Sequence, residues 1–330
     1  MSPFMVVPVP REQMTDAIAA IAGAKRIVIA CHVSPDGDAL GSLLGLGLGL
    51  RTAGKDVVLL SADGVPETLA FLPESNTVQI STDRRDFDLA IVVDSGDLTR
   101  IGHAREAVES APLLMDVDHH VTGAPFGTIR LIDGEAAATA EIVFDLLISL
   151  GLEITVPIAE NLLCGILTDT GSFRFRNTTP RTFQVASALT AIGASPNPIA
   201  EAVFENRSFM AQKILGRALE NMKISDDGAV VWSAVTQSDF AETGATDADT
   251  DGVSSQLQAV RGAKVALFLR EANPGSYRVS LRSKEPFDSS AVAARFGGGG
   301  HKLASGCRLT GSLADVETQL LAAVATQFAA

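Results

Sequence analysis

Carboxylate and imidazole side chains directly follow three apolar runs of the chain, at residues 26–31, 89–93 and 112–117. These side chains are His32, Asp36, Asp38, Asp94, Asp118, His119 and His120. Carboxylates with a minority of imidazoles and no thiolate suit hard or borderline divalent cations, with manganese first and magnesium or cobalt next. The three segments therefore predict a metal site of this kind and argue against a cysteine-rich structural zinc site.

The apolar runs explain how these distant segments could meet. Continuous apolar runs separated by helical patterns indicate buried parallel strands, whose carboxyl ends face the ligand crevice of an open α/β sheet. Asp169, which follows the helical pattern at 158–167, adds another carboxylate. Together these side chains are numerous enough to hold two ions that share a bridging carboxylate. Paired ions about 3.5 to 4 Å apart are typical of hydrolases that cleave phosphate esters.

Four segments, taken in their order along the chain, resemble the four motifs of the DHH phosphoesterase family. They are His32-x-x-x-Asp36-x-Asp38, Val93-Asp94-Ser95, Asp118-His119-His120 and Thr168-Asp169-Thr170. Two C-terminal segments resemble the signature of the DHH-associated C-terminal domain. They are Leu281-Arg282-Ser283 and Gly297-Gly298-Gly299-Gly300-His301. The resemblance covers nearly the whole chain. Within this family, the segment at 34–42 is most similar to the nanoRNase and pAp phosphatase type.

The resemblance implies two metal sites that share Asp94 as the bridging ligand. The ligands of one ion would be His32, Asp36 and Asp94, and those of the other Asp38, Asp94, His119 and Asp169. His120 is then left to contact the scissile phosphate, and its intrinsic pKa suits a charged or proton-donating role there. Asp118 would orient an imidazole by hydrogen bonding. A role for His120 as a further metal ligand remains open at this stage.

The glycine-rich segment near the C-terminus is a weak signal by itself, since four glycines can equally form a flexible loop. Next to His301, and with Arg282 on a predicted strand, it favours backbone that a phosphate or a base approaches closely. The expected substrate contacts are Arg282, Ser283, Gly298, Gly299, Gly300 and His301. Arg174 and Arg176 alternate with phenylalanines, so an extended strand there would turn one face toward phosphates or bases, or simply toward solvent.

Periodicity places the elements that must position these side chains. The expected strands of the first half lie at 26–31, 56–61, 89–93 and 113–117, and the expected helices include 14–22, 39–52 and 136–150. Pro157 opens the next helix, which delivers Asp169. The stretch 39–50 is apolar and contains four glycines, and we expect it to form a buried helix. This alternation predicts a mainly parallel α/β sheet with helices on both faces.

The chain is expected to form two domains. Residues 1–195 would be the metal-binding DHH domain, residues 196–225 a helical linker, and residues 226–330 a smaller α+β domain with a mixed sheet that binds substrate. The turn Asn273-Pro274-Gly275 predicts a hairpin in the smaller domain. A length of 330 residues is sufficient for two separate cores.

Composition limits the possible partners. A formal net charge of −13 argues against a protein that coats long nucleic acid, because such binding needs many phosphate contacts from Lys and Arg. A short anionic substrate remains compatible. Three widely spaced cysteines predict reduced thiols in the cytoplasm. The most apolar stretch is shorter than the ~20 residues of a membrane span and no signal peptide is expected, so we expect no membrane association.

By resemblance, the expected activity is that of a manganese-dependent phosphoesterase with two metal ions that activate a hydroxide. It would hydrolyse short oligoribonucleotides (nanoRNA) to mononucleotides and dephosphorylate 3'-phosphoadenosine 5'-phosphate (pAp), as a homodimer. One alternative is a phosphodiesterase for cyclic or linear dinucleotides, and another is a nucleotide-binding regulatory protein without turnover. A processive exonuclease is expected to carry more domains, and a family II pyrophosphatase a different C-terminal domain.

Overall fold

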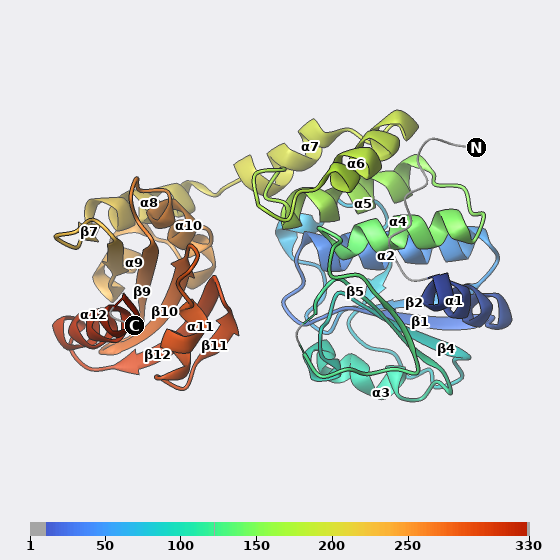
Figure 1. The fold of residues 1–330 in the computed structure, drawn as a ribbon, viewed down its shortest axis with the longest axis horizontal. Helices are drawn as coiled ribbons and strands as arrows, with labels where there is room; N and C mark the ends of the chain where they lie inside the picture. The colour runs from blue at the N-terminus through green and yellow to red at the C-terminus, as the bar shows by residue number, and fades with distance from the viewer. Residues whose placement is uncertain (1–10, 122, 329–330) are drawn as a thin grey trace. The chain divides into compact units, whose positions relative to one another are not determined.

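A computed structural model describes residues 11–121 and 123–328, apart from the side chain of His301. The chain divides into two compact units, Met1–Asn206 and Arg207–Ala330 (Figure 1). The division falls within residues 196–225, the segment that the sequence suggested as a linker. Helix α8 (Phe209–Glu220) belongs to the second unit, where it packs against a strand of that unit's sheet.

The first unit contains a six-stranded sheet in the order β3-β2-β1-β4-β5-β6, and every neighbouring pair is parallel. The strands are β1 (Arg26–Ala30), β2 (Asp56–Leu60), β3 (Val78–Gln79), β4 (Leu89–Val93), β5 (Leu114–Asp118) and β6 (Ile129–Ile132). The predicted parallel sheet is therefore confirmed. The chain runs outward from β1 to β3 and then returns to place β4 on the other side of β1. This reversal creates a crevice at the carboxyl ends of β1 and β4.

Helices cover both faces of this sheet, as predicted. They are α1 (Arg11–Gly23), α2 (Gly37–Thr52), α3 (Arg105–Val108), α4 (Thr139–Ser149), α5 (Val156–Asp169), α6 (Pro180–Ile192) and α7 (Pro196–Ala200). One core joins α1, α2 and α4 to side chains such as Ile29 and Ile91, while α3 covers the opposite face, where Val28 and Val92 lie. Helix α4 begins at Thr139 rather than at the expected residue 136, because residues 133–138 form a loop after β6.

Helix α2 is the buried helix predicted at 39–50, and its glycines have a packing reason. A Cβ on Gly41 would overlap the carbonyl oxygen of Asn161, and one on Gly45 would press on the Leu162 side chain. Both neighbours belong to α5, so the two helices approach each other more closely than larger side chains would allow. Glycine inside a helix costs roughly 0.5–1 kcal/mol relative to alanine, and the close packing of α5 against α2 offsets this cost.

The second unit contains a mixed six-stranded sheet in the order β11-β12-β10-β9-β8-β7, in which only the pair β8–β9 is parallel among the described residues. The strands are β7 (Lys223–Ile224), β8 (Val230–Val235), β9 (Val265–Asn273), β10 (Ser276–Ser283), β11 (Gly299–His301) and β12 (Ala304–Thr310). The predicted hairpin is β9–β10, and its turn uses the positive φ of Gly275. The expected mixed sheet is thus confirmed.

Helices also lie on both faces of the second sheet. They are α8, α9 (Gln237–Thr243), α10 (Val253–Gln258), α11 (Ser289–Ala294) and α12 (Leu313–Phe328). Helices α11 and α12 pack on the face that holds Leu267 and Val279, whereas α8 and α10 pack on the face that holds Ala266 and Phe268. None of the helices in the described part of the chain combines the length and apolarity that crossing a bilayer requires.

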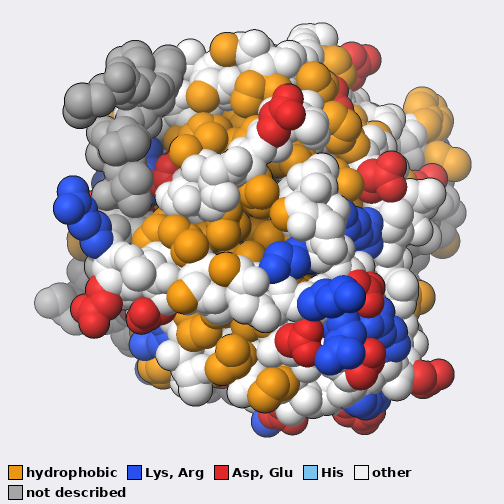
Figure 2. All heavy atoms as spheres, turned by 90° about the vertical axis from the view of Figure 1, so that its right-hand side faces the viewer, with side chains coloured by type: hydrophobic (Ala, Val, Ile, Leu, Met, Phe, Trp, Pro, Cys, Tyr) orange, Lys and Arg blue, Asp and Glu red, His pale blue; other side chains and the backbone are white. Residues whose placement is uncertain are grey.

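Charges of both signs are mixed on the face shown in Figure 2. There, apolar side chains form much of the central surface, and Lys and Arg side chains lie beside Asp and Glu side chains. Similar pairing is found at the amino ends of the strands in the first unit, where Arg84 contacts Asp56 at 2.8 Å and Arg26 contacts Asp88 at 2.7 Å. Exposed pairs of this kind contribute little to stability, but they neutralise basic side chains locally.

Candidate functional site

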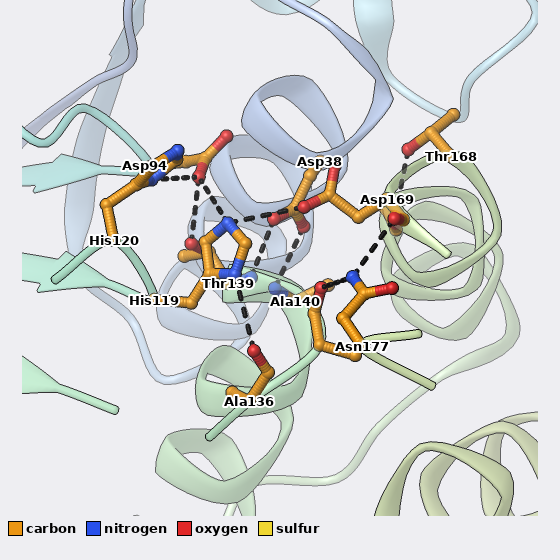
Figure 3. Close-up of polar contacts among 12 residues, drawn as sticks. Asp38, Asp94, His119, His120, Ala136, Thr139, Ala140, Thr168, Asp169 and Asn177 are labelled. Carbon is orange, nitrogen blue, oxygen red and sulfur yellow. Dashed lines mark hydrogen bonds and ion pairs between the residues drawn. The ribbon is translucent and has the colours of Figure 1, made fainter. Parts of the chain in front are cut away.

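The carboxyl ends of β1, β4 and β5 bring the sequence-predicted ligands together beside the end of α5 (Figure 3). Each of three groups offers ligand atoms that all lie within 4.8 Å of one another. The groups are His32 with Asp36 and Asp94; Asp38 with His119 and Asp169; and Asp94 with Asp118, His119 and His120. All six predicted metal ligands therefore meet at the crevice where the strand order reverses, and Asp94 belongs to two of the groups.

Asp94 lies at the centre of the site and is 2% exposed. Its Oδ2 lies 3.6 Å from Nε2 of His32, and its Oδ1 lies 3.6 Å from Nε2 of His119. The Thr139 hydroxyl donates a hydrogen bond to the same Oδ1 at 3.0 Å. Burial alone would raise the pKa of Asp94, but His120, His32 and His119 outweigh it and lower this pKa below the usual range of a carboxyl.

Two other carboxylates of the site have pKa values shifted in the opposite direction. Asp38 is completely buried, and burial, followed by repulsion from Asp94 and Asp169, raises its pKa well above the usual range. Burial and the charges of Asp94 and Asp36 raise the pKa of Asp169 in the same way. So many buried carboxylates repel one another unless a cation lies between them. The electrostatics thus match the donor set of a divalent metal site.

Two backbone N–H groups at the amino end of α4 hold Asp38 in place. Thr139 N donates to its Oδ2 at 2.6 Å, and Ala140 N donates to its Oδ1 at 2.9 Å. Asp36 instead caps the amino end of α2, because its Oδ1 accepts hydrogen bonds from the N–H groups of Asp38 and Ala39. The capping bonds of Asp36 engage one oxygen and leave the other available to a ligand.

His32 and His119 are oriented alike. Nδ1 of His32 contacts the Val33 carbonyl oxygen at 2.8 Å, and Nδ1 of His119 contacts the Ala136 carbonyl oxygen at 3.3 Å. If each Nδ1 carries the proton and donates to its carbonyl, each Nε2 presents a lone pair to the carboxylates. For His119 this nitrogen lies 3.2 Å from Oδ2 of Asp169. A backbone carbonyl that fixes the ring in this way is typical of metal-binding histidines.

His120 differs from the other two histidines. Its Nδ1 contacts Oδ1 of Asp118 at 2.8 Å and lies 3.4 Å from Oδ1 of Asp94. These two carboxylates raise the pKa of His120 to about 10, and Asp118 has the larger effect. Asp118 also accepts hydrogen bonds from the N–H groups of Gly96 at 2.5 Å and His120 at 3.0 Å. These bonds engage both of its oxygens, so Asp118 is arranged to orient His120.

Several residues that position the site were absent from the sequence-based expectations. Asn177 donates to the carbonyl oxygens of Ala137 at 2.9 Å and Asp169 at 3.1 Å, which ties the 133–138 loop to the end of α5. Arg181 contacts Asp133, in the same loop, at 2.6 Å. Thr139 lies 45 residues from Asp94, and Arg181 lies 48 residues from Asp133, so the linear sequence carries no signal for these two contacts.

The first part of the predicted substrate-binding set lies at the end of β10. Arg282 is half-buried, and burial lowers the pKa of its guanidinium. Ser283 points to the other face of the strand and is 3% exposed. The Ser283 hydroxyl lies 3.2 Å from the carbonyl oxygen of Phe287 and 3.3 Å from that of Lys302. It therefore holds the fold together locally, whereas Arg282 is more open to solvent.

The glycine-rich segment is partly a strand, not only a flexible loop. Gly299 pairs with Gly306 and Gly300 with Ser305 in β11, at the edge of the sheet. A Cβ on Gly298 would overlap the carbonyl oxygen of Gly306, so this position requires glycine. The side chain of His301 lies outside the described residues.

The extended strand considered for Arg174 and Arg176 is not found. Ser172 and Phe173 both have positive φ, so the chain turns there, and Nε of Arg174 donates back to the carbonyl oxygen of Gly171 at 2.6 Å. The alternation of arginine and phenylalanine therefore does not create two opposite strand faces. The turn at 171–174 therefore prevents the extended conformation that the alternating sequence predicted.

Comparison with known proteins follows the same division of the chain. Residues 26–166 match the family described as "DHH family, N-terminal domain", and residues 208–330 match the "DHHA1 domain". A curated Thermus thermophilus protein named "Bifunctional oligoribonuclease and PAP phosphatase NrnA" is 34% identical, over 86% of this chain and 84% of its own length. The Bacillus subtilis protein of that name is 30% identical, over 92% of this chain and 97% of its own length.

Solved structures show the same fold. The crystal structure of an exopolyphosphatase-related protein from Bacteroides fragilis superposes with a TM-score of 0.92, at 26% identity and over 98% of both chains. RecJ from Thermus thermophilus in complex with Mn²⁺ superposes with a TM-score of 0.60 at 17% identity. That comparison covers 98% of this chain and 56% of RecJ.

Proposed function

This chain belongs to the DHH family, and we propose that this hydrolase is a manganese-dependent phosphoesterase that converts short oligoribonucleotides to mononucleotides. We propose pAp as a second substrate. Relatives at 30–34% identity over most of the chain carry names that describe these two activities. The single observation that carries the proposal is the central place of Asp94, which shares one ligand group with His32 and Asp36. Its Oδ1 lies 3.6 Å from Nε2 of His119, the histidine that groups with Asp38 and Asp169.

The donor set fits two divalent ions. One would be held by His32, Asp36 and Asp94, and the other by Asp38, Asp94, His119 and Asp169. Two ions at such a site would supply positive charge to phosphoryl oxygens and lower the pKa of a water molecule to near neutrality. The raised pKa values of Asp38 and Asp169 beside Asp94 support this assignment, because cations would relieve the repulsion that causes the shifts.

The protein's own side chains then have distinct tasks. His120, held by Asp118, would donate a hydrogen bond to a non-bridging oxygen of the scissile phosphate and stabilise charge that develops there. Thr139 would keep the Asp94 carboxylate in one orientation through the hydroxyl bond at 3.0 Å. No serine, cysteine or lysine nucleophile is needed, since a water molecule would attack phosphorus as the P–O bond to the leaving hydroxyl breaks. The proton that the water loses would pass through a carboxylate or solvent to the leaving oxygen.

Substrate contacts in the second unit are proposed for Arg282, Gly298, Gly299, Gly300 and His301. Arg282 is half-buried, so its charge is less screened than that of a fully exposed arginine. The glycines expose backbone that a nucleotide could approach closely. For Ser283 we propose a supporting role, because its hydroxyl already has two carbonyl neighbours within the fold.

Localisation and assembly are also proposals. Cys31, Cys164 and Cys307 are buried free thiols, which supports a reducing compartment such as the cytoplasm. The acidic net charge of −13 supports short nucleotides, not long nucleic acid, as partners. On the family resemblance we propose a homodimer.

A substrate panel tests the proposed function. Purified protein with Mn²⁺ should release mononucleotides from two- to five-residue RNAs and phosphate from pAp, with lower rates on cyclic dinucleotides. Asp94→Ala should abolish both activities. Asp83→Asn should leave them unchanged, because this exposed carboxylate makes no hydrogen bond or ion pair within the described residues. Full activity of the Asp94 variant, or turnover of cyclic dinucleotides alone, would refute the proposal.

A further inference from the structure

Three arginines form a row across the sheet of the second unit. In the strand register, Arg278 of β10 lies directly opposite Arg270 of β9 on one side and Arg308 of β12 on the other. Side chains at directly opposed positions have Cβ atoms about 4.5–5.5 Å apart, and like charges there destabilise a sheet. The fold therefore keeps three positive charges side by side at a cost, in a chain whose net charge is −13.

Neighbouring groups compensate this row only partly. Asp247 lies 2.8 Å from Arg278 and 3.4 Å from Arg270. Within the described residues, no hydrogen bond or ion pair is made by the exposed Arg308 guanidinium. Arg270 is half-buried, and its two Nη atoms donate to the hydroxyls of Thr250 and Ser280, each at 3.2 Å. One carboxylate thus faces three guanidinium groups, which leaves donors and positive charge for a further anion.

The arginine row borders a hollow of about 440 Å³. That volume lies within the range of small-molecule sites, about 300–1,000 Å³. The hollow is lined by the three arginines, by the neighbouring cross-strand pair Ser280 and Gly306, and by Phe296, Gly297 and Gly298. The small side chains leave the floor open, and the half-buried ring of Phe296 offers a surface on which a base can stack.

From these observations we infer that the hollow binds an internal phosphate of the oligoribonucleotide, together with its nucleoside. The inference rests on the proposed function and adds a second contact point to the site. Arg278 and Arg282 lie four residues apart on β10, so their Cα atoms are separated by about 13 Å. A substrate with several phosphates can engage both positions, whereas a mononucleotide bound at Arg282 cannot also fill the hollow. The hollow therefore favours oligonucleotides over pAp.

Arg308→Gln provides the cleanest test, because this side chain makes no bond within the described part of the chain. Binding of a 3'-labelled adenosine trinucleotide is measured by fluorescence anisotropy in EDTA, where divalent ions are withheld and turnover is avoided. We expect the dissociation constant of Arg308→Gln to rise about tenfold. The slope of log affinity against log salt should fall by about 0.7, the value for one lost phosphate contact on a single strand. The matched control is Arg261→Gln, an exposed arginine of the same unit outside the hollow, which should bind like the wild type.

Competition by unlabelled pAp separates the hollow from the Arg282 position. The inhibition constant of pAp should differ less than twofold between Arg308→Gln and the wild type. Three results would each overturn the inference. Arg308→Gln could bind the trinucleotide within twofold of wild type, the variant could weaken pAp and trinucleotide binding equally, or the wild type could fail to bind the trinucleotide. If binding depends on Arg308 as expected but Mn²⁺ supports no cleavage, the proposed function fails and the binding site stands.

Discussion

The first unit carries a cluster of proposed metal ligands around Asp94, and the second unit carries the arginine row. The two regions have opposite charges and follow from different kinds of sequence pattern. The cluster gathers carboxylates at the ends of parallel strands, and each ligand belongs to a short segment that can be recognised in the sequence. The arginine row depends on the register of three antiparallel strands, and its members lie in unrelated local sequences. Ligand-type residues at strand ends can therefore be recognised from short sequence motifs. A binding surface that runs across a sheet can be recognised only once the strand pairing is known.

The comparison predicts that the two regions control different kinetic constants. His119→Ala removes a proposed metal ligand that faces Asp94 and Asp169, so kcat on the trinucleotide should fall about a thousandfold or more. Trinucleotide binding in EDTA should stay within twofold of wild type. Arg308→Gln should show the reverse, with KM raised and kcat unchanged. Steady-state kinetics with Mn²⁺ on both variants checks this, and a kcat loss in Arg308→Gln would remove the distinction.

Arg181, a buried arginine near the proposed metal ligands, should matter for stability, unlike the exposed Arg308 of the row. Arg181 is 9% exposed and contacts Asp133 at 2.6 Å and Asp145 at 2.5 Å, with Glu141 at 3.5 Å. Arg181→Ala would leave three buried carboxylates without a counter-charge, so the free energy of unfolding should fall by about 3–5 kcal/mol.

Urea denaturation followed by circular dichroism measures this change. Arg308→Gln is the matched comparison, because it replaces an exposed arginine without a partner in the described residues, and surface substitutions of this kind stay within about 0.5 kcal/mol. Equal stabilities of Arg181→Ala and the wild type would show that the buried network is not needed to hold the 133–138 loop.

The smallest predicted effect concerns the carboxylate that partly neutralises the arginine row. Asp247 is exposed and pairs with Arg278 and Arg270. Asp247→Asn should free both guanidinium groups for phosphate and tighten trinucleotide binding about two- to threefold at low salt. Anisotropy titrations at two salt concentrations check this. Weaker binding by this variant would mean that Asp247 holds the arginines in their binding orientation.

Much of the first unit could be predicted from its sequence for physical reasons. Buried parallel strands need continuous apolar runs, so β1, β4 and β5 were recognisable, and ligands at their ends followed from the topology of such sheets. The start of α4 was misplaced, because Ala136 and Ala138 are good helix formers. They lie instead in the loop whose Ala136 carbonyl contacts His119. Tertiary packing overrides local propensity at that point.

Other features had no local signal. The hydrogen bond from Thr139 to Asp94 joins residues 45 positions apart, and the contact between Arg181 and Asp133 spans 48. The turn at Ser172 and Phe173 was missed because non-glycine residues rarely adopt positive φ. The arginine row depended on the exact pairing of β9, β10 and β12, since a shift of one residue would move each arginine to the opposite face.

An anomalous-difference map from crystals soaked in Mn²⁺ would test the proposed metal centre most directly. Two peaks are predicted for each chain, one beside His32, Asp36 and Asp94 and the other beside Asp38, His119 and Asp169, about 3.5 to 4 Å apart. The absence of peaks in this crevice at saturating Mn²⁺, or peaks only at other carboxylates, would contradict it.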